Sequence, residues 1–541
     1  MNINMAELGL PGLSVLTWVL AILPVAVILV LMLKLKMAGS RAGVISWVIA
    51  GLIAYFVFKA SPAVLAAGTV KGVWSTFFVL FIIWSSMFLY NLVDSTGSFK
   101  VIANKFTELT NGNKILQLLI LGWVFPTFIQ GVCGFGVPVA VATPLLIGLG
   151  FHPMLAVVTA LIGHSWGVTF GSLGASYSVL ISMSPAEAAP MAFWGSIFIA
   201  FGGVLAGFSI LHFYGKRELG GGFKGFKEGT FAVLFLSIVM GVALIATCFV
   251  SPYVATFVAG ALGLIAGSFV LPKFKAYQPA ADYVPEVEEG PKKSFLEAFS
   301  AYIILIVVVF IVYLVPVIKN ALEAPVFLLG LSFPETSIGF GMTNAATAKY
   351  SALKILTTPG TLIVVSSILA GLFYKAKGLL PQGAVKASFD KTVKQSIGST
   401  TTIIPMTMMA VLMTEAGLTL YIAYGIAMVA GQFFPILSPF IGLLGGFVTS
   451  SGTSSNILFT GLQYNVADVL NISPYIILAM QTTASSLSNS FSPGNAALGT
   501  GVSNQGGKEG EILKYTGFYN IMQNIGIGLL GYILVMMGLG L

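Results

Sequence analysis

The chain has 541 residues, of which 57% are hydrophobic and only 8% are charged. A soluble protein of this size needs far more surface charge, so the composition predicts a multi-pass protein of the cell membrane. The formal net charge of +8 does not indicate a nucleic-acid partner, because the lysines lie in short segments between apolar runs, where they orient a membrane protein. The two cysteines, Cys133 and Cys248, lie in apolar segments and predict no disulfide framework or metal cluster. We expect no cofactor.

The apolar segments predict an all-α fold. The run 12–33 lacks a basic leader and a cleavage site and is long enough to span a bilayer, so residues 1–40 are predicted to hold a first transmembrane helix. Further segments are expected at 44–58, 73–93, 114–150, 153–182, 190–213, 229–250, 252–271, 297–316, 360–374, 394–414, 418–470, 474–500 and 515–540. We expect about 12 transmembrane helices and two re-entrant hairpins.

A charged stretch with prolines at 273–293 is too polar for lipid and is predicted to be a solvated linker between two halves. The first half is expected to hold a repeat at 41–228 with a hairpin at 114–150. Connecting helices and the linker would fill 229–359, and a second repeat at 360–541 would carry a hairpin at 418–470. The sequence leaves open whether 318–358 is a loop or a re-entrant segment.

The repeat is predicted from an offset of about 320 residues. At this offset Gly97 aligns with Gly417, Pro153 with Pro474 and Gly174 with Asn495. The first two intervals are 56 and 57 residues, and the next two are both 21 residues. With the N-terminus outside, 21 of the 26 lysines and arginines face the cytoplasm, which leaves five outside. The helix ending at Gly97 then runs inward and its counterpart ending at Gly417 runs outward, so the repeats are predicted to be inverted.

Two interrupted stretches predict one binding site. Gln130 to Pro138 and Thr449 to Asn456 place glycines, a proline and hydroxyl residues inside apolar segments. Such breaks persist in a membrane only inside protein or beside a wet cavity. Half-helix N-termini and neutral donors suit a small, singly charged anion. Both arginines, Arg41 and Arg217, are predicted to lie in loops, so no guanidinium is expected at the site.

The predicted substrate-binding residues come from these breaks and from the helices that follow them. They are Gln130, Cys133, Gly134, Phe135, Gly136, His164, Ser165, Ser172, Thr453, Ser454, Ser455, Asn456, Ser492 and Asn495.

Simpler interpretations stay open for these residues. The glycines could serve close helix packing, and the hydroxyl cluster could serve hydrogen bonds between helices. His164 is either a ligand and proton relay or a structural histidine. Asp94, Glu187 and Glu415 lie near predicted helix ends and are expected to be solvated or to cap helices.

Three motifs carry a resemblance to a known family. FIQGVCGFGVPVA at 128–140, PLLIGLGF at 144–151 and SGTSSNILF at 451–459 resemble the L-lactate permease family, and the resemblance covers nearly the whole chain. It implies a secondary transporter of lactate, glycolate or related 2-hydroxy monocarboxylates, usually driven by protons. It also implies two inverted repeats, with a mobile transport domain moving against a scaffold.

The chain departs from this resemblance at one position. Members of the family carry a glutamate where this chain has Gln130. Glutamine does not titrate. If protons drive transport, the predicted coupling residues are His164, which can take up the proton, and Gln130, which stands in the place of the glutamate. Sodium is the alternative coupling cation.

The expected function is cation-coupled uptake of a small monocarboxylate across the cell membrane by alternating access. Alternatives are an uncoupled transporter, a carrier of a sulfonate or dicarboxylate, and an anion channel. An enzyme is not expected, because no set of catalytic side chains falls at one depth. The expected partners are the anion, H⁺ or Na⁺ and the bilayer, and a homodimer is an open option.

Overall fold

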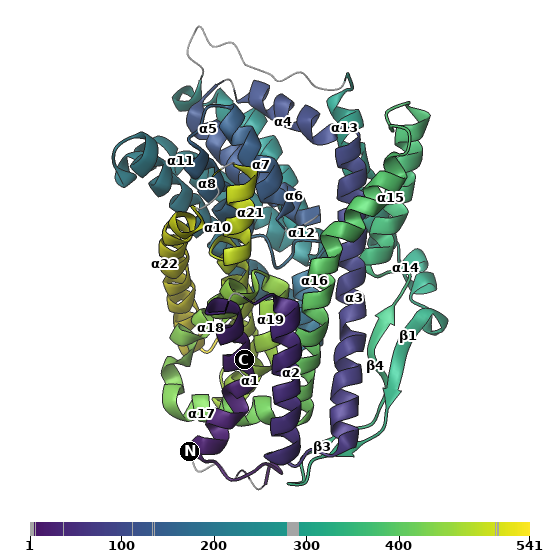
Figure 1. Cartoon of the computed structure of the whole chain (residues 1–541). Helices are drawn as coiled ribbons and strands as arrows, with labels where there is room; N and C mark the ends of the chain where they lie inside the picture. Colours follow the sequence, from purple (N-terminus) through teal and green to yellow (C-terminus); the bar gives the residue numbers. More distant parts are fainter. Residues whose placement is uncertain are drawn as a thin grey trace.

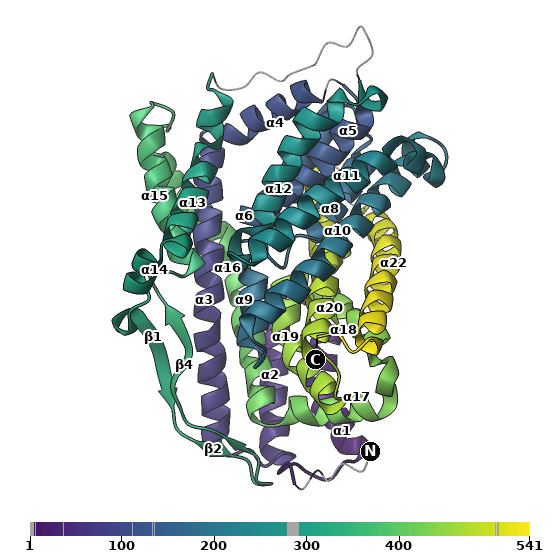
Figure 2. The same cartoon turned by 180° about the vertical axis from the view of Figure 1, so that it is seen from behind.

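The computed structural model describes residues 5, 7–35, 37–110, 112–132, 134, 136–278, 292–503, 505 and 508–540. Helices dominate this part of the chain, as Figures 1 and 2 show. Among the described residues, nine helical stretches are long and apolar enough to cross a membrane, and four shorter apolar helices accompany them. The polytopic helical membrane fold is therefore confirmed, whereas the count of about 12 spans stays a prediction.

The first part of the chain is helical throughout. It contains α1 (Val15–Leu33), α2 (Gly39–Phe56), α3 (Pro62–Ser95), α4 (Ser98–Leu109), α5 (Lys114–Leu119), α6 (Phe125–Val132), α7 (Val137–Gly148), α8 (Pro153–Ser165), α9 (Ala175–Ser182), α10 (Ala188–Glu218), α11 (Gly222–Cys248) and α12 (Ala255–Ile265). A π-helical turn at Ile120–Val124 joins α5 to α6, and another at Ala266–Val270 extends α12. Residues 279–291 of the predicted linker lie outside the described residues.

The second part adds ten helices and a few short strands. The helices are α13 (Phe295–Leu314), α14 (Pro316–Leu322), α15 (Pro359–Ala376), α16 (Ala384–Glu415), α17 (Leu418–Ala430), α18 (Phe434–Thr449), α19 (Gly452–Val469), α20 (Pro474–Leu487), α21 (Pro493–Val502) and α22 (Glu509–Met536). The predicted hairpin at 418–470 thus holds three helices, of which α18 and α19 form the hairpin and α17 precedes it.

The two halves share an order of elements around the breaks. In the first half a long helix, α3, is followed by α4, the hairpin of α5, α6 and α7, the interrupted pair α8 and α9, and α10. In the second half α16 is followed by α17, the hairpin of α18 and α19, the interrupted pair α20 and α21, and α22. Figure 1 places α4 and α17 at opposite ends of the molecule. This order supports the inverted repeat, which stays a prediction.

The region 318–358, which the sequence left undecided, contains a two-stranded antiparallel ribbon. Strand β1 (Leu328–Phe333) pairs with β4 (Thr347–Lys354), and the short strands β2 (Thr336–Ser337) and β3 (Thr343–Asn344) continue it. The ribbon lies beside α3 in both views (Figures 1 and 2). Among the described residues, this ribbon departs from the all-α prediction.

Helices α3 and α16 cross side by side and are joined by two ion pairs. Lys71 Nζ lies 2.8 Å from Glu415 Oε2, with side-chain exposures of 5% and 12%. The rings of Phe333 and Tyr350 cover Lys71 at 5.3 and 5.2 Å. The expectation of a solvated or capping Glu415 is therefore wrong, because the ribbon and the lysine exclude water from this carboxylate.

The second pair lies nearer the other end of these helices. Lys391 Nζ lies 2.9 Å from Asp94 Oδ2, and both side chains are more than a third exposed. Asp94 is therefore partly solvated as predicted, but ion-paired. Glu187, the third of the acidic residues predicted to lie near helix ends, is exposed at the N-terminal end of α10.

The prediction that both arginines lie in loops is also wrong. Arg41 lies in the first turn of α2, and Arg217 lies in the last turn of α10. Arg217 pairs with Glu511 of α22 at 2.8 Å.

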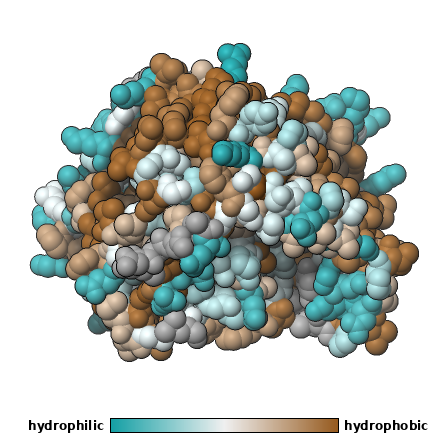
Figure 3. Space-filling model, turned by 90° about the horizontal axis from the view of Figure 1, so that it is seen from below, coloured by the Kyte–Doolittle hydropathy of each residue, from teal (hydrophilic) through white to brown (hydrophobic). Residues whose placement is uncertain are grey.

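Apolar side chains cover much of the described surface. Figure 3 views the end of the molecule that carries the N-terminus and shows broad apolar areas with polar side chains scattered among them. On α22, Phe518, Ile525 and Ile533 are each at least 40% exposed. Such faces suit contact with lipid, because a soluble monomer seldom exposes contiguous apolar patches of this kind.

Candidate functional site

The first hairpin turns at a glycine in the left-handed region. Helix α6 ends at Val132 and α7 begins at Val137, with Gly136 between them at a φ of 83°. A side chain is strained at this φ, so glycine suits the turn. Pro138 follows within the first turn of α7, where its missing N–H costs nothing. The helix break within the segment 114–150 lies at these residues, and the re-entrant hairpin stays a prediction.

The break between α8 and α9 holds the end of α6 in place. Ser172 N donates to the carbonyl of Gln130 at 2.7 Å, and Leu173 N donates to the carbonyl of Gly131 at 3.1 Å. In return, Gly134 N donates to Ser172 Oγ at 2.8 Å. These bonds satisfy backbone groups that a helix end leaves free, which hydrocarbon cannot do.

The second hairpin turns at Ser450, which has a φ of 54°. The next residue, Ser451, caps α19 by accepting a hydrogen bond from Ser454 N at 3.2 Å. Ser450 Oγ accepts from Gly494 N at 3.0 Å, which ties the hairpin tip to the beginning of α21. The second tip is thus held by the interrupted helix behind it, as the first tip is.

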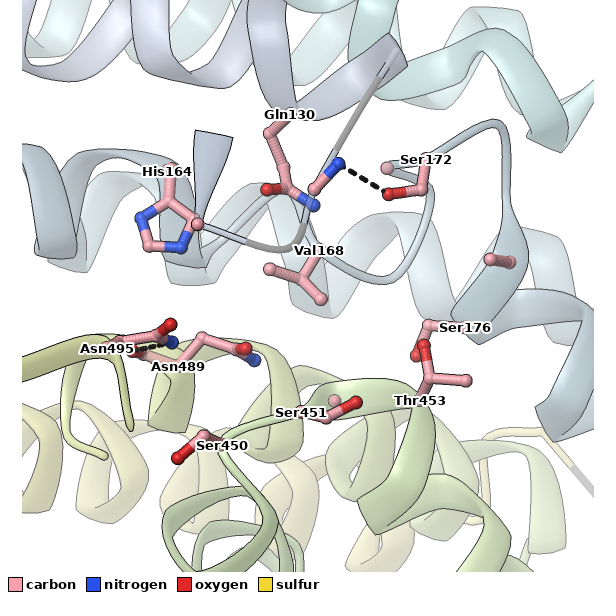
Figure 4. A pocket seen from close by; sticks show the side chains of 15 residues that line it. Gln130, His164, Val168, Ser172, Ser176, Ser450, Ser451, Thr453, Asn489 and Asn495 are labelled. Carbon is pink, nitrogen blue, oxygen red and sulfur yellow. Dashed lines mark hydrogen bonds between the residues drawn. The ribbon is translucent and has the colours of Figure 1, made fainter. Parts of the chain in front are cut away.

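A small buried cavity lies where the two tips and the two interrupted helices meet. Its volume is about 40 Å³ for the centres of water molecules, which is room for a few waters or a ligand of a few heavy atoms. The lining residues are Gln130, Gly134, Gly136, His164, Val168, Gly171, Ser172, Ala175, Ser176, Ser450, Ser451, Gly452, Thr453, Asn489 and Asn495. Figure 4 shows Gln130, His164 and Ser172 on one wall, facing Ser451, Asn489 and Asn495 on the other.

The cavity is polar, yet none of these lining residues is an acid, a lysine or an arginine. Three of its hydroxyl oxygens already accept a hydrogen bond. Ser172 Oγ accepts from Gly134 N, Ser176 Oγ from Asn456 Nδ2, and Ser451 Oγ from Ser454 N. Each hydroxyl hydrogen therefore remains to be donated, and a serine can donate it to a bound anion.

His164 supplies an acceptor to the same cavity. Its Nδ1 lies 3.0 Å from the carbonyl oxygen of Ala160. A carbonyl only accepts hydrogen bonds, so this contact assigns the hydrogen of the neutral ring to Nδ1. The Nε2 atom is then an acceptor, and Figure 4 shows the His164 ring directed towards the cavity. The cavity thus offers both donors and an acceptor to one ligand.

The structure brings half of the predicted site residues to the cavity. Gln130, Gly134, Gly136, His164, Ser172, Thr453 and Asn495 line it. Ser454 lines a neighbouring cavity. Ser165 and Ser455 are buried away from it and donate to the carbonyls of Ile162 and Gly442. Ser492 precedes α21 and donates to the carbonyl of Asn489 at 3.4 Å. Cys133 and Phe135 lie outside the described residues.

Asn456 lies behind the cavity wall. Its Nδ2 donates to Ser176 Oγ at 3.1 Å and to Thr482 Oγ1 at 2.9 Å, while its Oδ1 accepts from Ser485. Asn456 therefore positions Ser176 and joins the broken helices of the two halves.

Sequence reasoning missed several residues of the cavity. Val168, Ala175 and Ser176 lie in or beside the α8–α9 break and carry no motif of their own. Ser450, Ser451, Gly452, Gly171 and Asn489 belong to interrupted stretches that the sequence does show, although the individual residues were not selected.

The apolar helices and the buried polar cavity between two broken hairpins define a multi-pass transporter of the cell membrane rather than an enzyme. The profile of the family described as L-lactate permease matches residues 17–538. The chain belongs to the L-lactate permease family.

Individual relatives agree with this assignment. The chain is 29% identical to the glycolate permease GlcA of Escherichia coli (strain K12), with 95% of this chain and 94% of the relative covered. It is 26% identical to the L-lactate permease of Halalkalibacterium halodurans, with 95% and 96% covered. Among solved structures it is similar to the Alcanivorax borkumensis YdaH transporter, with 14% identity, a TM-score of 0.45, and 87% and 88% of the two chains covered.

Proposed function

We propose that the chain is a secondary transporter that carries small 2-hydroxy monocarboxylates, such as lactate and glycolate, together with a cation. The observation that supports this most directly is the neutral cavity between the hairpin tips. Relatives named as glycolate and L-lactate permeases, aligned along almost the whole chain, support the same substrate class.

The groups of the cavity suit the two unlike ends of a 2-hydroxy acid. A carboxylate needs donors, which the hydroxyls of Ser172, Ser176 and Ser451 supply. A hydroxyl group needs an acceptor for its hydrogen, which the side-chain oxygens of Gln130 and Asn489 can supply, as can His164 Nε2 while its ring is neutral. A dicarboxylate would bring a second buried charge, and no cationic side chain lines the cavity to balance it.

Coupling is assigned to His164 if protons drive the transport. Gln130 lines the cavity but does not titrate, and among these lining side chains His164 is the one that can take up a proton. A proton on Nε2 would turn the acceptor into a charged donor and favour the anion. Anion and proton would then bind together, which is the linkage that symport requires. Sodium bound by carbonyls and hydroxyls at the tips is the alternative.

Alternating access is proposed from the paired breaks. The two halves share an order of elements, and each contributes one hairpin and one interrupted helix to the cavity. An anion channel would need a continuous wet path, whereas the cavity lies between two hairpins that end inside the protein. Saturable uptake driven by a gradient distinguishes the transporter from the channel, which gives an ohmic current.

The experiment is uptake of labelled lactate and glycolate into proteoliposomes. A pH gradient is imposed with and without sodium, and a sulfonate and a dicarboxylate serve as competitors. We expect uptake that saturates, depends on the pH gradient and is inhibited by 2-hydroxy monocarboxylates alone. His164→Gln is expected to lose the proton dependence. Uptake that needs sodium would move the coupling to the hairpin tips, and a variant with full proton-driven uptake would exclude His164.

A further inference from the structure

A second cavity adjoins the first, between α16 and the second hairpin. It has a volume of about 260 Å³ and reaches Gly398, Thr402 and Ile403 on α16. Thr449 and Ser454 line its hairpin side. We call this space the α16 vestibule. Its size exceeds that of the binding cavity by several fold, so it admits a whole hydrated anion.

The α16 vestibule and the binding cavity share a wall. Ser450, Ser451 and Asn495 line both spaces. Ser450 is held in the left-handed region, and its hydroxyl bonds to the backbone of Gly494, which also lines the vestibule. A small movement of this tip would therefore join the two spaces.

Towards the C-terminal end of α16 the space beside the vestibule is filled. Ile403 of α16, Ile457 of α19 and Val179 of α9 form a buried apolar cluster, with Leu80 and Trp84 of α3 packed against it. A charged ligand cannot cross such a cluster cheaply. This cluster therefore closes the vestibule on the side of the C-terminal end of α16 and favours an exit towards the N-terminal end of α16.

That end of α16 is basic. Lys386, Lys391 and Lys394 lie within its first three turns, and the charge pattern of the chain predicts that this end faces the cytoplasm. Lysines near the mouth of a passage raise the local concentration of anions. Gly398 lies farther along the same helix, where it is exposed.

We propose that the α16 vestibule is the cytoplasmic passage to the binding cavity, with Gly398 and Thr402 as residues of its wall. The structure then represents an inward-facing state, and α16 contributes side chains to the path of the substrate. This inference rests on the proposed transport function.

Gly398 offers a sharp test, because a Cβ added there meets no atom within 4 Å. Gly398→Trp places a large side chain at the wall of the vestibule, and its Cβ displaces no packed atom. Ile397→Trp is the matched control, since Ile397 is 51% exposed on the same turn of α16 and does not line the vestibule. We expect Gly398→Trp to lower the rate of lactate uptake at least tenfold, while Ile397→Trp stays within twofold of the parent chain.

A labelling experiment tests the passage without relying on transport. Gly398→Cys is treated with a charged, membrane-impermeant thiol reagent in right-side-out and inside-out vesicles, and labelling above that of the parent chain is measured. We expect reaction from the cytoplasmic side alone.

Reaction from the outside, or none from either side, overturns the passage. Equal uptake by the two tryptophan variants does the same. If the parent chain takes up no hydroxy acid, the proposed function fails, yet the sidedness of Gly398→Cys still decides the passage. Should Gly398→Trp fail to fold, the cysteine variant carries the test.

Discussion

Ser176 gives the cleanest measure of how the cavity holds an anion. Its hydroxyl oxygen accepts from Asn456 Nδ2, and the hydroxyl hydrogen remains for the ligand. In Ser176→Ala the Nδ2 atom of Asn456 keeps two other acceptors, the backbone oxygen of Ser176 at 3.2 Å and Thr482 Oγ1 at 2.9 Å. No buried donor is left without an acceptor, so we expect the free energy of unfolding to fall by no more than about 1 kcal/mol.

The effect on binding is expected to be larger. A hydrogen bond to a charged group contributes about 1.5–3 kcal/mol. At about 1.4 kcal/mol for each factor of ten, its loss raises the Kd for lactate roughly 10- to 150-fold.

The assay compares lactate-induced thermal stabilisation in detergent for the parent chain, Ser176→Ala and Ser165→Ala. Ser165 is a matched control, because it is fully buried and its hydroxyl bonds to Ile162 O, away from the cavity. An unchanged Kd in Ser176→Ala refutes donation by this hydroxyl, and an equal loss in Ser165→Ala shows that the effect is structural.

Two further predictions concern the buried ion pair between α3 and α16 and the orientation of the chain in the membrane. Lys71→Met leaves Glu415 buried without its partner, so the unfolding free energy should fall by about 3–5 kcal/mol. Lys391→Met removes an exposed pair and should cost less than about 1 kcal/mol; equal melting temperatures for the two variants would contradict this reasoning. For orientation, Lys386→Cys should react with impermeant reagent from the cytoplasmic side and Gln432→Cys from outside, since both positions are exposed. The reverse labelling would invert the predicted topology.

The breaks could be predicted from the sequence because they have a local cause. Glycine, proline and clustered hydroxyl residues disfavour a continuous apolar helix wherever they occur together. Both tips therefore lie inside the predicted stretches, at Gly136 and at Ser450. The cavity between them follows, because broken backbone needs partners that lipid does not supply.

Residues chosen by pairing across the fold could not be predicted in this way. Ser176 sits in the first turn of an ordinary apolar helix, and only the position of Asn456, 280 residues later, shows what its hydroxyl does. The ion pair between Lys71 and Glu415 spans 344 residues. Its burial depends on a strand ribbon whose composition does not differ enough from its neighbours to reveal it.

The two halves share backbone breaks but supply unlike chemistry to the cavity. The first half contributes an amide, an imidazole and serine hydroxyls, and the second half contributes further hydroxyls and two asparagines. Two identical walls would present the same groups to both ends of a ligand, which suits a symmetrical molecule. A 2-hydroxy acid has one end that only accepts hydrogen bonds and another that also donates, so it needs unlike walls. Backbone geometry therefore explains where the cavity lies, and the side chains at the breaks are where substrate choice and coupling should change by mutation.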